Sequence, residues 1–217
     1  MKILGFSDFH NRIGSVRQAS RIVSIEHPDI VVVAGDLANV DMRGAKYILE
    51  ELSKVSSKVL FVPGNMDDPA LANWKDDDHV ICLHGKKMLQ SGVWFIGLGG
   101  AVSSHFRTPF EFDEAGASRI LARAAEPDLK PVILVSHCPP RDTELDLAFG
   151  RWHVGSKAVR SFIEENSPAL VICGHIHEAR GVDLIGTTSI VNVGATAHGD
   201  YASISFLDPL KIELRRF

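Results

Sequence analysis

Cysteine is scarce in this sequence and forms no recognisable motif. The three cysteines, Cys82, Cys138 and Cys173, lie within or beside apolar runs, which is typical of buried thiols in a reducing compartment. No Cys-x-x-Cys pair is present, so neither a thiolate metal site nor a disulfide framework is expected. We therefore expect a cytoplasmic protein without disulfides.

Long apolar runs, signal sequences and low-complexity segments are also missing. No run approaches the roughly 18 apolar residues of a membrane span, and residues 1–6 are too short for the apolar core of a signal peptide. No linker rich in proline and serine divides the chain. We therefore expect one soluble domain over residues 1–217, with no membrane association and no export signal.

Basic charge is too sparse for a nucleic-acid-binding surface. The formal net charge is −4, and the short basic pairs at residues 86–87 and 215–216 are explained by a hairpin turn and a chain end. Non-specific binding to nucleic acid needs clustered Lys and Arg. A polynucleotide partner is therefore not favoured, and we expect a small substrate instead.

Short apolar runs predict buried strands, and longer periodic segments predict helices. Runs of four or five apolar residues, many of them β-branched, fit strands buried on both faces at residues 3–6, 30–34, 59–62, 132–135 and 170–173. Helices are predicted at residues 14–26, 44–55, 114–125 and 157–166, and further strands at 80–83, 93–98, 189–193, 202–207 and 212–215. This order predicts an α/β fold, a four-layer α-β-β-α sandwich of two mixed β-sheets flanked by helices.

A short polar cluster follows each of the five buried runs. The clusters are Ser7-Asp8-Phe9-His10, Gly35-Asp36-Leu37, Gly64-Asn65-Met66-Asp67, Ser136-His137-Cys138 and Gly174-His175-Ile176-His177. Open α/β sheets bind ligands at the carboxyl ends of their strands, where these clusters are expected to lie. Carboxylates, imidazoles and an amide are ligands of divalent metals such as Mn²⁺, Fe²⁺ or Zn²⁺. The pattern therefore predicts a two-metal hydrolase.

The spacing within two clusters predicts how their side chains are presented. Asp8 and His10 are two residues apart, as are His175 and His177. Residues i and i+2 of an extended chain face the same side, so we expect each pair to leave its strand end together.

The five clusters, in this order, resemble the signature of the calcineurin-like metallophosphoesterases. That signature is Asp-x-His, Gly-Asp, Gly-Asn-x-Asp, a lone His after a strand, and Gly-His-x-His, and here it spans residues 8–177. The resemblance implies one metal held by Asp8, His10 and His177, a second held by Asn65, His137 and His175, and Asp36 as a bridge between them. It implies two divalent ions (Mn, Fe, Zn or Ni, with Mn favoured) about 3.5–4 Å apart and a metal-bridging hydroxide as the nucleophile.

One position departs from the family pattern. Many members carry a His after the Gly-Asn of the third cluster, where it contacts the phosphate and assists the leaving group, but this chain has Met66. A thioether cannot donate a proton, so we expect phosphodiesters or activated phosphates to be favoured over unactivated monoesters. We expect catalytic roles for Asp36, Asn65 and Asp67, with the Asp67 carboxylate orienting a ligand histidine.

Four further residues are candidates for substrate contact. His105 and Arg107 lie in a loop that could fold over the metals, and His153 precedes a predicted helix whose N-terminus, capped by Ser156, favours phosphate. His198 follows residues 192–196, which resemble an Asn-x-Gly-Ser block that closes the family's site. A purely structural role is the alternative for each of the four.

The remaining histidines are expected to lie at the surface. His27, His79 and His84 stand beside Pro, Asp or Gly in segments that are typical of turns.

The favoured hypothesis is a metal-dependent phosphoesterase that acts on a small phosphorylated substrate, such as a nucleotide or cyclic nucleotide. Alternatives within the superfamily are a phosphomonoesterase, a nuclease or a protein phosphatase; a nuclease lacks a basic groove here, and a protein phosphatase usually carries the His that Met66 replaces. A non-catalytic interaction module that retains the fold is a third alternative, against which the complete ligand set argues. Exposed edges of the two sheets would allow a homodimer.

Overall fold

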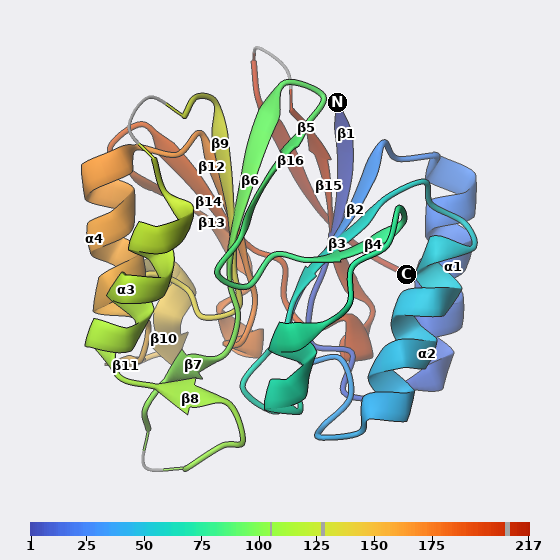
Figure 1. The fold of residues 1–217 in the computed structure, drawn as a ribbon, viewed down its shortest axis with the longest axis horizontal. Helices are drawn as coiled ribbons and strands as arrows, with labels where there is room; N and C mark the ends of the chain where they lie inside the picture. Colours follow the sequence, from blue (N-terminus) through green and yellow to red (C-terminus); the bar gives the residue numbers. More distant parts are fainter. Residues whose placement is uncertain (105, 127–128, 207–208) are drawn as a thin grey trace.

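The computed structural model describes residues 1–104, 106–126, 129–206 and 209–217. Over these residues, two six-stranded mixed sheets pack face to face, with α1 and α2 outside one sheet and α3 and α4 outside the other (Figure 1). The predicted four-layer α-β-β-α sandwich is therefore confirmed. None of the helices in the described part of the chain is long and apolar enough to cross a membrane.

The first sheet has a parallel half and an antiparallel half. Its strand order is β16-β15-β1-β2-β3-β4. Strands β1 to β4 are parallel to one another, β15 is antiparallel to β1, and β16 is antiparallel to β15. The strands are β1 (Lys2–Phe6), β2 (Ile30–Ala34), β3 (Val59–Val62), β4 (Val80–Cys82), β15 (Asp200–Ser205) and β16 (Lys211–Arg216). The helices α1 (Ile13–Glu26) and α2 (Met42–Ser53) connect its first three strands.

The second sheet has a parallel centre and antiparallel edges. Its order is β13-β14-β12-β9-β6-β5, and only the edge strands β5 and β13 run antiparallel to their neighbours. The strands are β5 (Lys87–Gln90), β6 (Val93–Leu98), β9 (Val132–Ser136), β12 (Leu170–Cys173), β13 (Gly181–Ile185) and β14 (Thr188–Asn192). The helices α3 (Glu114–Ala124) and α4 (Lys157–Asn166) cover its outer face.

Two small ribbons extend from the second sheet. They pair β7 (Ala101–Val102) with β8 (Glu111–Phe112), and β10 (Leu147–Ala148) with β11 (Trp152–His153). Short 3₁₀ helices also occur in the loops, namely η1 (Pro69–Asn73), η2 (Glu144–Asp146), η3 (His177–Ala179) and η4 (Thr196–His198).

The core has three apolar layers because strand residues alternate between two buried faces. In β1, Ile3 points into the layer between the two sheets, whereas Leu4 packs in the layer beneath α1 and α2. Ile133 of β9 belongs to the layer between the sheets, and Leu134 to the layer beneath α3 and α4. Every one of these side chains is fully buried, which explains why the strand sequences are continuously apolar.

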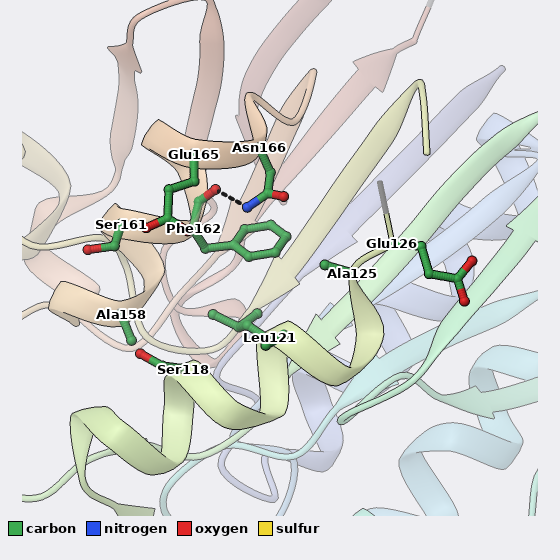
Figure 2. Close-up of a pocket in the computed structure, with 10 residues that line it drawn as sticks. Ser118, Leu121, Ala125, Glu126, Ala158, Ser161, Phe162, Glu165 and Asn166 are labelled. Carbon is green, nitrogen blue, oxygen red and sulfur yellow. Dashed lines mark hydrogen bonds between the residues drawn. The ribbon is translucent and has the colours of Figure 1, made fainter. Parts of the chain in front are cut away.

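A hollow of about 420 Å³ lies between α3 and α4 on the outer face of the second sheet (Figure 2). Leu121, Ala158 and Phe162 form its apolar wall, and Glu126 and Glu165 are also among its lining residues. None of the residues that line it belongs to the five polar clusters. It is therefore separate from the region where the sequence predicts chemistry.

Sequence periodicity missed both edge strands of the second sheet, as well as the two-residue strands of the small ribbons. β5 contains Lys87 and Gln90 and is only partly buried, and β13 alternates exposed Val182 and Leu184 with half-buried residues. Neither has the continuous apolar run of a central strand. The turn expected before residue 87 is present, closed by a hydrogen bond from the Lys86 N–H to the Leu83 carbonyl, but it is not a hairpin turn, because it carries the chain from β4 in one sheet to β5 in the other.

The expectation that His84 lies at the surface is wrong, although His27 and His79 are exposed. The His84 ring is half-buried, its centroid lies 5.2 Å from that of Phe110, and its Nδ1 accepts a hydrogen bond of 2.9 Å from the Gly99 N–H. Burial, reinforced by the nearby positive charge of Lys86, lowers the pKa of His84 to about 4. The folded protein therefore holds this imidazole neutral as an acceptor.

We predict that His84 makes the protein less stable in mild acid. The unfolded chain binds the proton first, so the contribution of His84 to stability is complete above the ordinary pKa of 6.5 and is lost as the pH falls towards about 4. The free energy of unfolding, measured in urea, falls between about pH 7 and pH 5. This fall should be roughly 1–2 kcal/mol smaller in His84→Asn than in the unsubstituted protein. His79→Asn, at an exposed position, is the control. Equal pH dependence of the His84→Asn variant and the unsubstituted protein would refute the prediction.

Candidate metal centre

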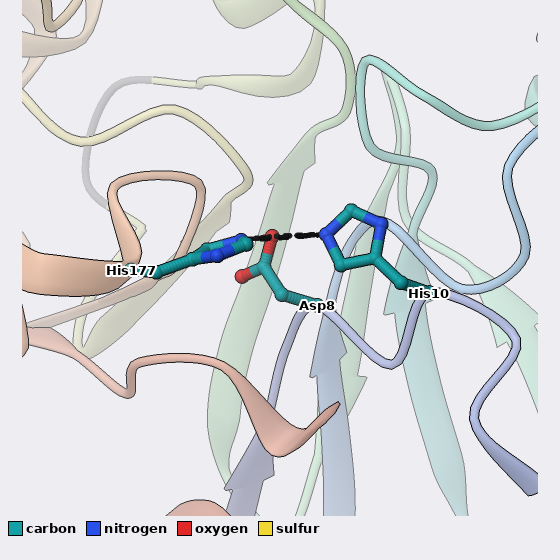
Figure 3. Close-up of side chains that lie close together, drawn as sticks. All are labelled: Asp8, His10 and His177. Carbon is teal, nitrogen blue, oxygen red and sulfur yellow. Dashed lines mark hydrogen bonds and ion pairs between the residues drawn. The ribbon is translucent and has the colours of Figure 1, made fainter. Parts of the chain in front are cut away.

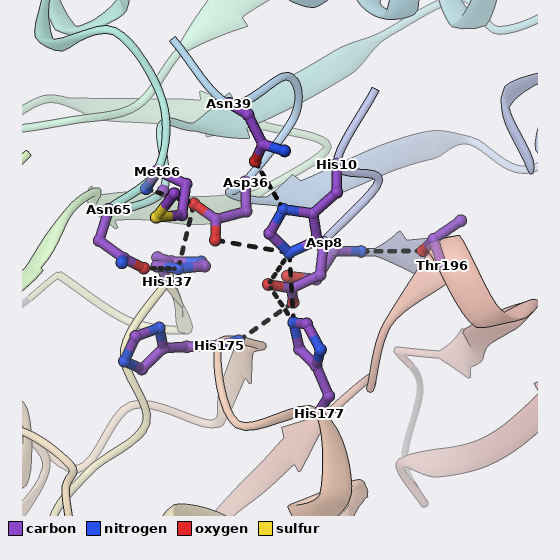
Figure 4. A network of polar contacts seen from close by, with 12 residues as sticks. Asp8, His10, Asp36, Asn39, Asn65, Met66, His137, His175, His177 and Thr196 are labelled. Carbon is purple, nitrogen blue, oxygen red and sulfur yellow. Dashed lines mark hydrogen bonds and ion pairs between the residues drawn. The ribbon is translucent and has the colours of Figure 1, made fainter. Parts of the chain in front are cut away.

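The loops that follow β1, β2, β3, β9 and β12 converge at one end of the two packed sheets. Parallel strands of both sheets finish at this end, so their loops meet there. Figure 4 shows the side chains that gather at this point, including all seven that the sequence assigns to metal binding: Asp8, His10, Asp36, Asn65, His137, His175 and His177.

Asp8, His10 and His177 form the first half of the site (Figure 3). Each offers one ligand atom, and these atoms all lie within 4.8 Å of one another. The Nε2 atoms of the two histidines are 3.3 Å apart, and Asp8 Oδ1 lies 3.7 Å from that of His10 and 3.2 Å from that of His177. The Asp8 side chain is fully buried, and within the described residues its Oδ1 receives no hydrogen bond.

His137, Asn65 and His175 form the second half. His137 Nδ1 lies 2.7 Å from the Ala34 carbonyl oxygen, to which it donates, and its Nε2 lies 2.8 Å from Asn65 Oδ1. The centroid of the His175 ring is 4.9 Å from that of His137. Burial lowers the pKa of His137 and lowers that of His175 to about 4, so both imidazoles are neutral.

The Asp36 carboxylate lies between the two halves. Its Oδ2 is 3.7 Å from His10 Nε2, and its Oδ1 is 3.5 Å from His137 Nε2. The Met66 N–H donates a 2.8 Å hydrogen bond to Oδ1 and fixes the rotation of the carboxylate. Burial, and then the negative charge of Asp8, raise the pKa of Asp36 to about 6. Each oxygen thus faces a different histidine.

The donor set fits divalent cations. Because His137 Nδ1 donates to a carbonyl, its Nε2 presents a lone pair to another acceptor, the Asn65 oxygen. The Nε2 atoms of His10 and His177 face each other, and the buried Asp8 Oδ1 lacks a donor among the described residues. Buried acceptors that face one another are costly unless a positive charge lies between them. Imidazole nitrogens with carboxylate and amide oxygens suit first-row divalent ions.

Two glycines permit the close approach of the loops. Gly35 has a φ of 95°, and a Cβ at this position would overlap the His137 ring. A Cβ on Gly64 would overlap the Asp36 carboxylate. The glycines of the Gly-Asp and Gly-Asn clusters are therefore required by packing around the candidate ligands.

The expected contact between Asp67 and a ligand histidine is not formed. Instead, the buried Asp67 carboxylate accepts hydrogen bonds from the N–H groups of Gly64 and Ala38, both at 2.8 Å, and of Leu37 at 3.0 Å. Three amide donors on two loops compete successfully for this carboxylate, and the Ala34 carbonyl orients His137. Asp67 therefore joins the Gly-Asp loop to the Gly-Asn loop.

The expectation of two extended pairs is also wrong. Asp8 and His10 have φ values of 56° and 46°, so they meet through a left-handed turn rather than by strand alternation. His175 has a φ of 71°, and the chain then enters η3. His177 consequently joins Asp8 and His10, whereas His175 lies beside His137.

The candidate substrate residues differ in their relation to the site. His198 is exposed, and its ring centroid lies 6.0 Å from that of His177. His153 Nδ1 is 2.7 Å from the buried Asp146 carboxylate, and in the described part of the chain no hydrogen bond or ring contact joins His153 to the seven clustered side chains. Arg107 is exposed on its loop. His105 lies outside the described residues.

Sequence reasoning missed Asn39, and it placed Thr196 only within the block at residues 192–196, without a role of its own. Asn39 Oδ1 lies 2.7 Å from His10 Nδ1, and Thr196 Oγ1 accepts a 3.1 Å hydrogen bond from the N–H of Ser7, beside Asp8. The available signal was weak: Asn is among the residues that tolerate a left-handed backbone, and Asn39 follows Asp36 closely in a loop.

Comparisons with known proteins agree with this fold and show the family of the chain. The family model described as calcineurin-like phosphoesterase matches residues 1–179. An uncharacterized protein of Methanocaldococcus jannaschii is 33% identical over 199 residues, which cover 88% of this chain and 87% of the relative. The chain therefore belongs to the calcineurin-like phosphoesterase family, as the resemblance predicted.

Solved structures share the fold at low sequence identity. The structure of the protein TT1561 from Thermus thermophilus superimposes with a TM-score of 0.79 and 19% identity, covering 99% of this chain and 98% of that one. A dimetal phosphatase from Danio rerio gives a TM-score of 0.66 and 13% identity, covering 100% and 96% of the two chains.

We predict that metal binding stabilises the folded protein. A ligand that binds only the folded state at about 100 times its Kd adds roughly 2.7 kcal/mol, so Mn²⁺ should raise the unfolding temperature of chelator-treated protein by about 5–10 °C. Asp36→Asn should reduce this shift without lowering the stability of the metal-free protein, because it removes a buried charge next to Asp8.

Differential scanning calorimetry with and without Mn²⁺ measures the shift. Asp142→Asn, at an exposed position whose side chain pairs with Arg141, is the matched control and should keep the full shift. An equal shift in the Asp36→Asn variant would contradict metal binding at this site.

Proposed function

We propose that this protein hydrolyses small phosphodiesters or activated phosphates at a dinuclear metal centre, with Mn²⁺ as the favoured ion. The observation that carries the proposal is the position of Asp36, whose oxygens face His10 on one side and His137 on the other at 3.7 and 3.5 Å. A carboxylate in this position can bridge two cations. Membership of a phosphoesterase family supports the reaction class.

The proposed ligand assignment follows the two halves of the site. Asp8, His10 and His177 would hold one ion, Asn65, His137 and His175 the other, and Asp36 both. When bound, such a pair supplies Lewis acidity, which polarises the phosphoryl oxygen and makes a water molecule nucleophilic at neutral pH.

The residues around the proposed centre determine its charge and the orientation of Asp36. Only Asp8 and Asp36 bring negative charge among the proposed ligands, because Asn65 is an amide and His137 and His175 are held neutral by burial. A centre with few anionic ligands keeps more positive charge for a phosphate. The Met66 N–H holds the Asp36 carboxylate in the rotation that turns one oxygen to each side.

The leaving group receives little help from the third cluster. The Met66 side chain is half-buried beside the site (Figure 4) and offers no proton. The exposed His198, close to His177, is the group we propose for contact with the substrate. Esters whose leaving groups depart without protonation should therefore react best.

We predict that bis-p-nitrophenyl phosphate is hydrolysed faster than p-nitrophenyl phosphate in the presence of Mn²⁺. Both activities should disappear in EDTA and fall by at least about a hundredfold in Asp36→Ala, because a bridging carboxylate contributes to both metal positions. Release of p-nitrophenolate measures the rates. Failure of the metal-loaded protein to cleave either ester would exclude the proposed reaction.

We predict that Met66→His raises monoesterase activity relative to diesterase activity. A histidine at this position supplies a proton donor for a poor leaving group, an effect that is typically about 10²–10⁴-fold in general acid catalysis. Met66→Leu provides a side chain of similar size without a proton donor and should leave the ratio unchanged. The ratio of kcat/KM for phenyl phosphate to that for bis-p-nitrophenyl phosphate is the measurement, and an equal change in both variants would rule out proton donation as the cause.

A further inference from the structure

We propose that Asn39 is a positioning residue of the metal centre, which fixes the tautomer and ring orientation of His10 and thereby the affinity of one of the two metal positions. The inference rests on the proposed function for the identity of the ligands. It goes beyond that function because Asn39 touches neither ion nor substrate in this scheme.

The first step is the contact itself. His10 Nδ1 lies 2.7 Å from Asn39 Oδ1 (Figure 4), and no other polar atom of the described residues bonds to this nitrogen. An amide oxygen can only accept, so Nδ1 must carry the hydrogen. The neutral imidazole then has its lone pair on Nε2, the atom that faces Asp8, Asp36 and His177.

The second step is the difference between His10 and the deeply buried His137. The Nδ1 of His137 donates to the backbone carbonyl of Ala34, a partner that no side-chain substitution removes. The His10 side chain is 22% exposed and depends on a side-chain acceptor. The rotation of its ring is therefore less constrained by packing, and the Asn39 hydrogen bond contributes more to it.

The third step is the backbone that presents Asn39. Asn39 and Val40 have φ values of 43° and 64°, both in the left-handed region. This conformation is uncommon for Asn and a marked outlier for a β-branched residue, with a cost of roughly 1–3 kcal/mol. Such strain persists only where surrounding contacts hold it in place.

Those contacts come from the third cluster. The Val40 N–H donates a 2.8 Å hydrogen bond to the Met66 carbonyl, and the Asp67 carboxylate binds the N–H groups of Leu37 and Ala38. The turn that carries Asn39 is thus fastened to the loop that carries Asn65. The same Met66 donates its own N–H to Asp36.

The orientation of His10 is consequently set by the loop of the other metal position. Movement of residues 64–67 would shift Val40, then Asn39, and then the ring that Asn39 holds. The chain of contacts has no gap from Met66 to His10. In this series of contacts Asn39 acts through its side chain, whereas Met66 and Val40 act through their backbones. Substitution of the Asn39 side chain therefore removes the contact with His10 and leaves the backbone hydrogen bonds in place.

Asn39→Gly tests this without adding strain, because glycine adopts the left-handed conformation readily. We expect one Mn²⁺ to bind about 10–100-fold more weakly, while the affinity for the other changes little. Asn39→Asp keeps an acceptor for Nδ1 and should restore binding. Asn11→Gly is the matched control, since Asn11 also has a left-handed backbone, with a φ of 59°, but contacts Asp41 at 3.0 Å and makes no hydrogen bond to His10. Isothermal titration of Mn²⁺ into metal-free protein gives both affinities.

A second measurement separates this inference from the proposed function. Imidazole ¹⁵N shifts of the metal-free protein report the tautomer of His10; we expect the Nδ1–H form in the unsubstituted protein and in Asn39→Asp, and a mixture of tautomers in Asn39→Gly. The same tautomer in the unsubstituted protein and in both variants overturns the positioning role, whatever the metal data show. If the unsubstituted protein binds no Mn²⁺ while the tautomers differ as expected, the proposed function fails and the Asn39 contact stands. Unchanged Mn²⁺ affinities in Asn39→Gly would also overturn the inference.

Discussion

The candidate site depends on one packing constraint, the face-to-face contact of two sheets whose parallel strands finish at the same end. The first sheet brings Asp8, Asp36 and Asn65 to this end, and the second brings His137 and His175. Neither sheet alone has both the carboxylates and the second set of imidazoles. The fully buried layer between the sheets therefore sets the distances across the site.

This arrangement concentrates groups that are unfavourable neighbours without a cation. Two buried carboxylates lie side by side, and the pKa of Asp36 rises to about 6 partly because Asp8 is close. Several residues of the site have left-handed backbone conformations, including Asp8, His10 and Asp36. The close-packed core from which these loops extend offsets this cost. The side chains of such a site are preorganised for a cation. Little rearrangement of the side chains would therefore accompany cation binding.

The sequence predicts the central strands and the clusters that follow them, because these depend on burial and on the order of residues along the chain. It does not predict contacts that depend on the local conformation of the backbone. Central strands were recognised because both of their faces are apolar, whereas the edge strands β5 and β13 carry polar or exposed residues and were missed. The clusters of candidate ligands can be predicted because each follows a buried run. The partners of Asp67 and the contact between Asn39 and His10 were not predictable, because they require left-handed turns that only tertiary packing holds in place.

The third cluster shows why a change of side chain there can leave the centre intact. Met66 serves the site through its backbone, since its N–H holds Asp36 and its carbonyl holds Val40. Asp67 likewise secures two loops through backbone amides. Neither contact of Met66 depends on the identity of its side chain. In the proposed reaction, replacement of a proton donor by a thioether therefore changes the leaving groups that can depart but not the geometry that holds the metals.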